Sequence, residues 1–208
     1  MRFGLYVITD EEISHGLSHV EVARKAAEGG ADVIQLRDKA RTSKDLLSIA
    51  LQIREVTRSA GVTFIINDRL DLALASGADG VHLGQEDLPI PFARKVSGNG
   101  FIIGTSVRTV EEALIAETEG ADYIALSPIF NTPTKSDAGP GKGLEMLKRI
   151  KAAVSIPVIA IGGIGKGNVR QVMDAGADGV AVISAIVGQK DIVKATAEMR
   201  SLVYQAKK

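Results

Sequence analysis

Polar and charged side chains follow a short apolar run early in the chain, at a spacing that suits phosphate binding. The segment Gln35-Leu36-Arg37-Asp38-Lys39 alternates along an extended chain, which places Gln35, Arg37 and Lys39 on one side. An arginine beside a lysine offers several charged donors to the oxygens of an anion. The alternative is the start of a solvated loop that makes only surface ion pairs.

Two aspartates follow the next two apolar runs and could share a divalent cation. Asp68 comes after the run 62–66 and Asn67, and Asp87 comes shortly after the run 81–83. Neighbouring strands lie about 5 Å apart, and two carboxylates completed by water and a substrate phosphate are typical of a magnesium site. Alternatively, Asp68 caps the following helix and Asp87 starts a turn.

Two single residues near the same strand ends are less informative. Ser106 could donate its hydroxyl to a ligand or be an ordinary loop residue. His82 by itself is more often a packed strand residue than a catalyst. A zinc site is disfavoured because His82 is the one histidine near these aspartates in the pattern.

Glycines late in the chain indicate a second anion site. The segments Gly162-Gly163-Ile164-Gly165 and Ile183-Ser184 each end an apolar run and precede a helical pattern. Glycines let backbone N–H groups approach a ligand, and helix N-termini favour anions. A nucleotide P-loop is excluded because it needs glycine where Ala160 stands. A glycine-rich turn chosen for tight packing is the alternative.

The link 127–143 is unusually long for a connection without secondary structure, and such links are functional or disordered. Thr132, Thr134 and Lys135 supply two hydroxyls and an ammonium within four residues. We expect this link to form a lid that orders when an anion binds and that excludes water. The alternative is an idle surface loop.

A repeated tripeptide indicates the elements that must position these residues. Gly-Ala-Asp begins at Gly30, Gly77, Gly120 and Gly176, each time after an amphipathic segment and before an apolar run, so the glycine can end a helix in the left-handed conformation. Eight strands are expected, at residues 5–8, 33–36, 62–66, 81–83, 101–103, 123–126, 158–161 and 180–183.

Strands alternating with helices favour a parallel sheet, and eight such units favour one closed (βα)8 TIM barrel over residues 1–208. An open doubly wound sheet is the alternative. In a barrel, the residues that follow each strand meet at one end, where enzymes of this fold place their chemistry. All the segments described above follow predicted strands.

The composition excludes several classes of function. Lys plus Arg balance Asp plus Glu at 25 each, which gives no overall field for nucleic acid or an anionic membrane. The chain has no cysteine, so disulfides and thiolate-ligated metal sites are excluded. With no apolar run of membrane-spanning length and no signal peptide at the first residues, we expect a soluble cytoplasmic protein.

Taken together, the segments resemble the thiamin phosphate synthase family. The resemblance covers nearly the whole chain in order, and the combined pattern is highly specific. It rests on Gln35-Leu36-Arg37-x-Lys39, Asn67-Asp68, His82-x-Gly84-Gln85-x-Asp87, Thr132-x-Thr134-Lys135, Gly162-Gly163-Ile164 and Ile183-Ser184. The resemblance implies a Mg²⁺-dependent transferase that joins 4-amino-2-methyl-5-(diphosphooxymethyl)pyrimidine to 4-methyl-5-(2-phosphooxyethyl)thiazole and releases diphosphate.

The resemblance also implies roles for individual residues. Magnesium would be held by Asp68 and Asp87. The pyrimidine diphosphate would be held by Gln35, Leu36, Arg37, Asp38, Lys39, Asn67, Ser106 and Lys135. Of these, the catalytic residues would be Arg37, Lys39, Ser106 and Lys135. The thiazole phosphate would be held by Thr132, Pro133, Thr134, Gly163, Ile183 and Ser184. The sequence departs from the family at Asp38, where glutamate is frequent, and at Ser127, where glycine is frequent.

Two other functions are considered for the same barrel. A thiazole tautomerase-like isomerase would need neither the paired aspartates nor the Thr-x-Thr-Lys segment, and it has a catalytic histidine where this chain has Ser127. A non-catalytic sensor of phosphorylated ligands would bind them without turnover. The expected partners are two small phosphorylated substrates, with no nucleic acid and no membrane. An assembly of identical chains is left open.

Overall fold

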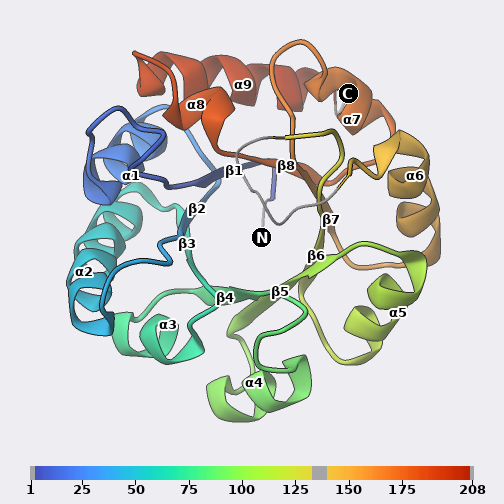
Figure 1. Ribbon diagram of the computed structural model, residues 1–208, viewed down its shortest axis with the longest axis horizontal. Coiled ribbons are helices and arrows are strands. Elements are labelled where there is room, and N and C mark those ends of the chain that lie inside the picture. Colours follow the sequence, from blue (N-terminus) through green and yellow to red (C-terminus); the bar gives the residue numbers. More distant parts are fainter. Residues whose placement is uncertain (1–2, 133–139, 207–208) are drawn as a thin grey trace.

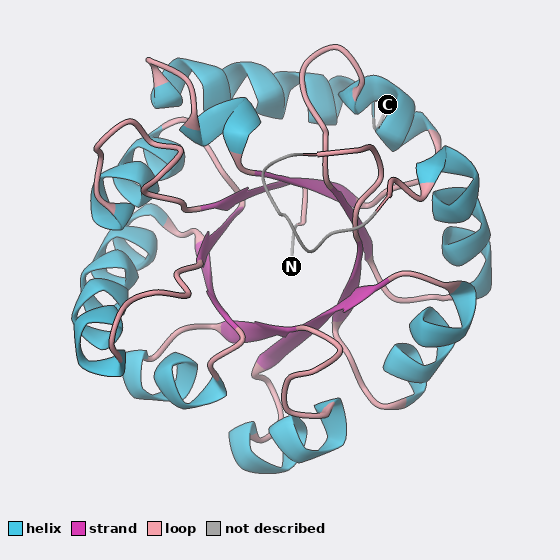
Figure 2. Ribbon diagram, viewed as in Figure 1, coloured by secondary structure: helices cyan, strands magenta, loops and turns pink. Residues whose placement is uncertain are grey.

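Eight parallel strands close on themselves in chain order, and helices surround them (Figures 1 and 2). The computed structural model describes residues 3–132 and 140–206. Each strand pairs with the next, and the last pairs with the first through Leu5 and Val180. The predicted (βα)8 barrel is confirmed, and the open-sheet alternative is wrong. The strands are β1 (Leu5–Ile8), β2 (Val33–Leu36), β3 (Thr63–Asn67), β4 (Gly80–Leu83), β5 (Ile102–Val107), β6 (Tyr123–Leu126), β7 (Val158–Ile161) and β8 (Gly179–Val182).

The helices form the outer ring of the barrel, and several begin at side-chain caps. Ser18, Thr42 and Thr109 each accept a hydrogen bond from the backbone N–H group three residues on. None of the helices within the described residues is long and apolar enough to cross a membrane. The helices are α1 (His19–Glu28), α2 (Ser43–Ala60), α3 (Leu70–Ser76), α4 (Ile90–Ser97), α5 (Val110–Thr118), α6 (Gly143–Ala153), α7 (Val169–Asp174), α8 (Ser184–Val187) and α9 (Ile192–Ala206).

The repeated glycines end helices in the left-handed conformation, as predicted. Their φ angles are 90° at Gly30, 66° at Gly77, 92° at Gly120 and 98° at Gly176. Glycine adopts this conformation at little cost, whereas a residue with a Cβ is strained there. The chain therefore turns sharply from each of these helices into the following strand.

The aspartate of each repeat clasps the preceding strand through two hydrogen bonds. Asp122, just before β6, donates its backbone N–H to the carbonyl of Ile103 and accepts the Ile103 N–H on Oδ2 at 2.7 Å. The same pair of bonds joins Asp32 to Leu5, Asp79 to Phe64 and Asp178 to Val158. These four aspartate clasps fix the starts of β1, β3, β5 and β7 against the strand that follows each of them.

Each clasp is also tied to the helical ring. Arg54 of α2, Arg94 of α4 and Lys151 of α6 form ion pairs of 2.6–2.9 Å with the clasp aspartates, and Tyr204 of α9 donates to Asp32. Three of the partners therefore lie on every second helix, α2, α4 and α6, and the fourth lies on α9. The sequence repeat predicted the strands, but the clasps themselves were not predicted.

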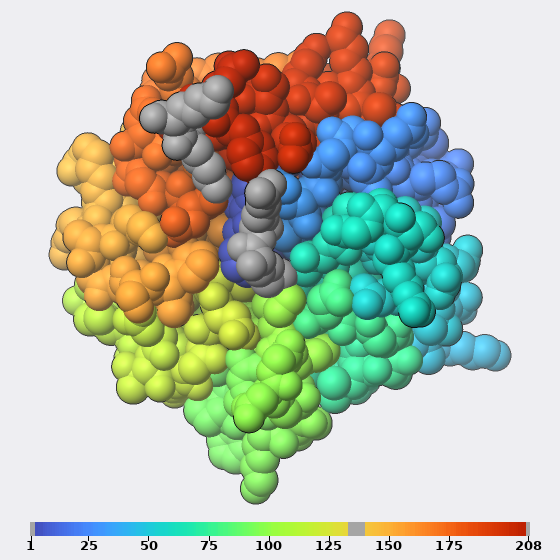
Figure 3. All heavy atoms as spheres, turned by 180° about the vertical axis from the view of Figure 1, so that it is seen from behind, coloured from blue at the N-terminus to red at the C-terminus, as the bar shows by residue number. Residues whose placement is uncertain are grey.

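The apolar core has two layers, one between strands and helices and one inside the barrel. The inner layer includes Tyr6, Ile65, Tyr123 and Ile159, all almost fully buried. Figure 3 shows, from behind, that the elements follow one another around the molecule in chain order and that the light-green region of α4 projects outward. Above the inner layer, at the carboxyl ends of the strands, polar residues begin.

Some strand ends differ from the prediction. β3 includes Asn67 and β5 extends to Val107, so Asn67 and Ser106 lie within strands rather than after them. Strand residues are held by hydrogen bonds on both sides, so both side chains are positioned more rigidly than loop residues would be.

Replacing a clasp aspartate should destabilise the barrel. We expect Asp122→Ala to lower the free energy of unfolding by about 1–3 kcal/mol, because the buried Ile103 N–H loses its charged acceptor. Asp122→Asn should lose less, since an amide oxygen can still accept. Urea denaturation followed by circular dichroism measures both. The control is Asp174→Ala, at an exposed helical ion pair, which should change stability by less than about 0.5 kcal/mol. Equal losses at the two positions would contradict the role of the clasp.

Candidate functional site

Two cavities open at the carboxyl end of the barrel, on opposite sides of the mouth. The first, of about 340 Å³, lies over β2 to β5. The second, of about 440 Å³, lies over β6 to β8 and the loops that follow them. The first cavity is lined by Arg37, Lys39, Asn67, Asp68, His82, Gly84, Gln85, Glu86, Asp87, Ser106 and Arg108.

The two predicted aspartates face each other in the first cavity. Burial, and after it the nearby Asp87 carboxylate, raises the pKa of Asp68 to about 6, against the opposing effect of Lys39 and Arg37. Two carboxylates held this close repel each other unless a proton or a cation lies between them. Across the described residues, no group of three or more acidic or histidine side chains is arranged to hold a metal. The pair therefore supplies only part of a coordination shell.

The backbone at Asp68 takes an unusual conformation that directs this carboxylate. Its φ angle is 61°, and its N–H donates to the carbonyl of His82 on β4 at 2.8 Å. Aspartate and asparagine tolerate the left-handed region better than other side chains. The capping alternative for Asp68 is wrong, because α3 follows Arg69 and has no side-chain cap. Asp87 does stabilise a turn, since its Oδ2 accepts the Gly84 N–H at 2.6 Å.

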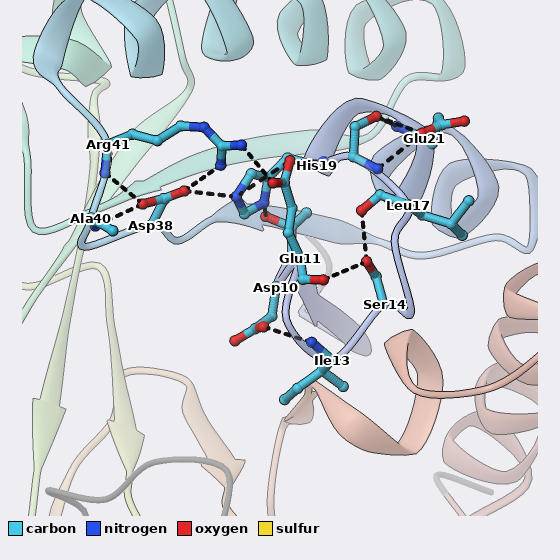
Figure 4. A network of polar contacts seen from close by, with 12 residues as sticks. Asp10, Glu11, Ile13, Ser14, Leu17, His19, Glu21, Asp38, Ala40 and Arg41 are labelled. Atoms are coloured by element: carbon cyan, nitrogen blue, oxygen red, sulfur yellow. Dashed lines mark hydrogen bonds and ion pairs between the residues drawn. The ribbon is translucent and has the colours of Figure 1, made fainter.

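Arg37 and Lys39 line the same cavity. Asp38 between them points toward Arg41 and His19 instead (Figure 4). The Asp38 carboxylate accepts hydrogen bonds from the backbone N–H groups of Ala40 and Arg41 and from the Arg41 guanidinium at 2.6 Å. Burial alone would raise its pKa, but these donors together with His19 hold the pKa of Asp38 well below its usual range. Asp38 therefore stays ionised and fixes the loop that carries the two cations.

Further contacts join this loop to the loop after β1. His19 is 2% exposed, with Nε2 at 3.1 Å from Asp38 and Nδ1 at 2.7 Å from Thr9. Glu11 accepts from Arg41 at 2.6 Å and from the His19 backbone N–H. Figure 4 shows these side chains converging from the two loops. The sequence analysis did not predict this network. Its members, a histidine, two acids and an arginine, all lie in or near the segments that follow the first two predicted strands.

Two amide side chains meet at the centre of the barrel mouth, beside the first cavity. Gln35 is 2% exposed and donates from Nε2 to Oδ1 of Asn67 at 3.0 Å. Gln35, Arg37 and Lys39 lie on one side of the chain, as the alternation predicted, whereas Leu36 packs outward into the strand–helix core. Among the described residues expected around the pyrimidine diphosphate, Leu36 and Asp38 are the two whose side chains do not line this end of the barrel. Lys135, also expected there, lies outside the described residues.

His82 and Ser106 meet above the inner core. His82 Nε2 lies 3.0 Å from Ser106 Oγ, and His82 Nδ1 lies 2.9 Å from the Tyr123 hydroxyl. Gln85 donates to the Ser106 carbonyl at 2.6 Å and ties the loop after β4 to β5. Arg108, which the sequence reasoning also missed, adds another guanidinium to the cavity one residue beyond the end of β5.

Glycines shape the second cavity. Gly162 and Gly163 have φ angles of 102° and 65°. A Cβ on Gly162 would lie 2.5 Å from Pro128, and one on Gly163 would lie 2.8 Å from the Phe130 side chain, so the loop after β6 packs directly on this turn. Phe130 donates its N–H to the Gly162 carbonyl at 3.1 Å. The turn is therefore packed tightly and also lines a cavity.

The predicted phosphate-binding residues that the structure describes come together here. The second cavity is lined by Thr132, Gly163, Ile183 and Ser184, together with Ser127, Asn131, Asn168 and Gln189. Ser184 starts α8, and its neighbour Ile183 follows the last residue of β8 and lies in the barrel mouth. Pro133, Thr134 and Lys135 lie outside the described residues. The proposed lid thus remains a prediction for its central part.

A third cavity of about 50 Å³, called the passage below, lies at the centre of the mouth and shares wall residues with each of the other two. Its polar wall carries Arg37, Asn67, His82 and Ser106, which also line the first cavity. Its other wall carries Ser127, Ile161, Ala181 and Ile183, which also line the second. Two phosphorylated ligands could therefore face each other with their reacting parts in a mostly apolar gap.

Comparisons with known proteins agree on one family. The model of a family described as thiamine monophosphate synthase matches residues 5–186. Thiamine-phosphate synthase of Methanoculleus marisnigri is 58% identical over 207 residues, covering 100% of this chain and 98% of that protein. The protein of the same name from Methanocella arvoryzae is 56% identical, covering 99% and 97%.

Solved structures give the same result for the fold. Thiamine phosphate pyrophosphorylase from Pyrococcus furiosus superposes with a TM-score of 0.91 at 46% identity, covering 98% of this chain and 96% of that one. A 3-hexulose-6-phosphate synthase superposes with a TM-score of 0.69 at 20% identity, and this likeness concerns the fold alone.

The closeness of the two aspartates can be tested by titration. Asp87→Asn should lower the pKa of Asp68 from about 6 toward the ordinary value of 3.8, although burial will keep it partly raised. Carbon NMR of the side-chain carboxyl groups measures this shift. Glu86→Gln, which lines the same cavity, should leave the Asp68 pKa in place.

The free energy of unfolding should depend on pH through the same carboxyl group. Because the Asp68 pKa is raised in the folded state, its contribution is fully present below pH 3.8 and is lost as the pH rises through about 6. Asp87→Asn should reduce that loss, as measured by urea denaturation across this range of pH. An unchanged Asp68 titration in Asp87→Asn would show that the carboxylates do not interact.

Proposed function

Because the chain belongs to the thiamine monophosphate synthase family, we propose that it condenses two phosphorylated substrates into thiamin phosphate. The substrates are 4-amino-2-methyl-5-(diphosphooxymethyl)pyrimidine and 4-methyl-5-(2-phosphooxyethyl)thiazole, and the second product is diphosphate. The observation that carries the proposal is the pair of cavities, one rich in charge and one lined by a glycine turn, with the passage between them.

The first cavity fits the pyrimidine diphosphate. Arg37 and Lys39 would bind its phosphate oxygens, and the Gln35 and Asn67 amides would face the aminopyrimidine ring. As the methylene carbon loses its bond to oxygen, the electron pair leaves with the diphosphate. The cations beside the leaving group meet this charge as it develops, which is where electrostatic stabilisation speeds a reaction most. Lys135, which lies outside the described residues, would add its ammonium to the diphosphate, as the family resemblance implies.

The aspartate pair fits a magnesium ion. Asp68 and Asp87 are two oxygen ligands in a partly buried site. Burial raises the pKa of Asp68 most, the Asp87 carboxylate raises it further, and a divalent cation would relieve the repulsion between the two carboxylates. Bound there, magnesium would neutralise charge on the diphosphate. The two carboxylates leave most of the coordination shell to water and phosphate oxygens, which is common for this ion.

The second cavity fits the thiazole phosphate. Backbone N–H groups of the Gly163 turn and of Ser184 would bind the phosphate, and Thr132 would add a hydroxyl. The thiazole nitrogen would then face the methylene carbon across the passage and attack it with its lone pair. A carbon–nitrogen bond forms, and the positive charge resides on the thiazolium product. No protein nucleophile is needed, and Ile161, Ala181 and Ile183 help exclude water.

The two other candidate functions lack a feature that favours them. A tautomerase-like isomerase would leave the aspartate pair unused. It would also need a catalytic histidine where this chain has Ser127, which lines the passage. A sensor would need only one ligand-binding cavity. The direct test is to mix both substrates with the protein and Mg²⁺ and to detect thiamin phosphate and diphosphate by chromatography. Binding of both substrates without product would support the sensor.

Loss of either aspartate should abolish the dependence on magnesium. We expect Asp68→Asn or Asp87→Asn to lower kcat/KM on the order of a hundredfold or more. Each variant would lose a carboxylate that holds magnesium, and with it the cation that would neutralise the departing diphosphate. Asparagine also tolerates the left-handed backbone at position 68, so the fold should persist. Binding of the thiazole phosphate, measured by calorimetry, should be unchanged because its cavity is separate. Glu86→Gln is the control and should stay within a few-fold; an equal loss there would contradict the assignment.

A side chain on the glycine turn should weaken only the thiazole phosphate. Gly163→Ala places a Cβ 2.8 Å from both Phe130 and Asn131 at a φ angle of 65°, so the turn must shift. We expect binding of this ligand to weaken about tenfold or more, with diphosphate binding retained. Gly165→Ala is the control, since a Cβ there meets nothing within 4 Å. Calorimetric titration with each ligand compares the two variants. Equal weakening of both ligands by Gly163→Ala would indicate general loss of structure instead.

A further inference from the structure

Four side chains form a continuous hydrogen-bonded chain from the barrel core to the diphosphate cavity. The Tyr6 hydroxyl lies 3.0 Å from that of Tyr123, and the Tyr123 hydroxyl lies 2.9 Å from His82 Nδ1. His82 Nε2 lies 3.0 Å from Ser106 Oγ. Tyr6 and Tyr123 are 2% and 0% exposed, whereas Ser106 lines both the first cavity and the passage. The chain therefore has one closed end and one open end.

The closed end decides in which direction the hydrogens point. Over residues 3–132 and 140–206, the Tyr6 hydroxyl has Tyr123 as its sole hydrogen-bond partner. If Tyr123 donated to Tyr6, the Tyr6 hydrogen would be left in the apolar core without an acceptor. Buried donors without acceptors are costly and rare, whereas an unfilled oxygen lone pair is better tolerated. Tyr6 must therefore donate to Tyr123.

The rest of the direction follows by counting hydrogens. A phenol has one hydrogen, so Tyr123, which accepts from Tyr6, keeps its own hydrogen for His82 Nδ1. If His82 Nδ1 carried a proton instead, it would donate to Tyr123, and the Tyr123 hydrogen would have no acceptor. Neutral His82 must therefore accept on Nδ1 and carry its proton on Nε2, which donates to Ser106 Oγ. The hydroxyl hydrogen of Ser106 is then left to point into the cavity.

We propose that this chain is polarised from Tyr6 to Ser106, fixing His82 as the Nε2–H tautomer and presenting the Ser106 hydroxyl to the cavity as a donor. Tyr123 and His82 are positioning residues in this proposal, because they act through Ser106. A phosphate oxygen only accepts hydrogen bonds, so a serine that donated to His82 would turn a lone pair toward it. The chain thus adapts the cavity to an acceptor-only ligand. The identity of that ligand as a diphosphate rests on the proposed function.

The barrel holds the central tyrosine in place. A Cβ on Gly104 of β5 would lie 2.0 Å from Cζ of Tyr123, so the ring occupies space that only glycine leaves open. The Phe3 ring packs on it at a centroid distance of 4.8 Å, and the His82 ring stacks on it at 5.6 Å with an interplanar angle of 29°. These contacts leave the Tyr123 hydroxyl aimed at Nδ1 rather than free to rotate away.

The direct test is the tautomer of His82, which does not depend on any activity. The three histidines, His15, His19 and His82, can be labelled with ¹⁵N in the full-length protein, and His82→Gln assigns the His82 signals. At a pH well above the ordinary imidazole pKa of about 6.5, long-range correlation spectra show which ring nitrogen carries hydrogen. We expect hydrogen on Nε2 alone. Hydrogen on Nδ1 would overturn the proposal.

Two tyrosine variants form a matched pair for the same measurement. Tyr6→Phe removes a buried hydroxyl but leaves Tyr123 to donate to Nδ1, so His82 should keep its tautomer. Tyr123→Phe removes an equally buried hydroxyl and the donor to Nδ1, so both tautomers should become populated. Equal behaviour of the two variants would overturn the proposal. If Tyr123→Phe proves unstable, the tautomer in the unchanged protein and in Tyr6→Phe still decides the direction.

Kinetics separate positioning from a structural role. Ser106→Ala should lower kcat/KM about tenfold or more, as expected for a hydrogen bond to a charged ligand. Tyr123→Phe should produce much of that loss, and the double variant should lose no more than Ser106→Ala alone, because both changes remove one interaction. Losses that multiply in the double variant would contradict the proposal. Binding of inorganic diphosphate with Mg²⁺ should weaken most in Ser106→Ala and in the double variant, and less in Tyr123→Phe. A protein that formed no thiamin phosphate but showed the Nε2–H tautomer would refute the proposed function and leave the polarised chain standing.

Discussion

The pairing of each clasp aspartate with the preceding strand is the constraint on which the rest of the structure depends. A parallel barrel has no turns between neighbouring strands to set their register, so something else must align them. Here the Asp32, Asp79, Asp122 and Asp178 side chains do so at the amino ends of alternate strands, and a helical side chain holds each of them. A shift of one residue would exchange the inner and outer faces of a strand. The clasps therefore determine which side chains reach the mouth, although they lie at the other end of the barrel.

The register divides the mouth into two chemically different halves. Strands β2 to β5 place Gln35, Asn67, His82 and Ser106 over the core, whereas β6 to β8 place Ala125, Ile161 and Ala181 there. The polar half can stabilise charge that leaves with a diphosphate, and the apolar half keeps water from the carbon left behind. The passage between the halves is narrow because the same inner layer of tyrosines and isoleucines closes it from below.

The barrel and much of the site could be predicted from sequence because local patterns encode them. The Gly-Ala-Asp repeats mark helix ends through a backbone conformation that glycine favours, and apolar runs mark buried strands. The aspartate pair was predictable because adjacent strands in a parallel barrel bring their ends together. What could not be predicted depends on contacts between distant segments. The His19–Asp38–Arg41 network joins two loops, and the Tyr6–Tyr123 contact spans 117 residues. Ser106 was expected after a strand but lies inside β5, because pairing with β6 extends that strand beyond its apolar run.

One residue of the site, Asp68, is unfavourable for the stability of the fold. Asp68 holds a left-handed backbone and faces another carboxylate, so both its conformation and its charge oppose folding when no cation is bound. The opposite arrangement occurs next door at Asp38, where backbone N–H groups and Arg41 stabilise the negative charge. The two aspartates thus have different tasks. Asp38 fixes the loop that carries Arg37 and Lys39, whereas Asp68 is stabilised only when a cation or a proton offsets its charge. The Asp79 clasp joins the amino ends of β3 and β4 and so sets the register in which these two strands bring the unfavourable pair together.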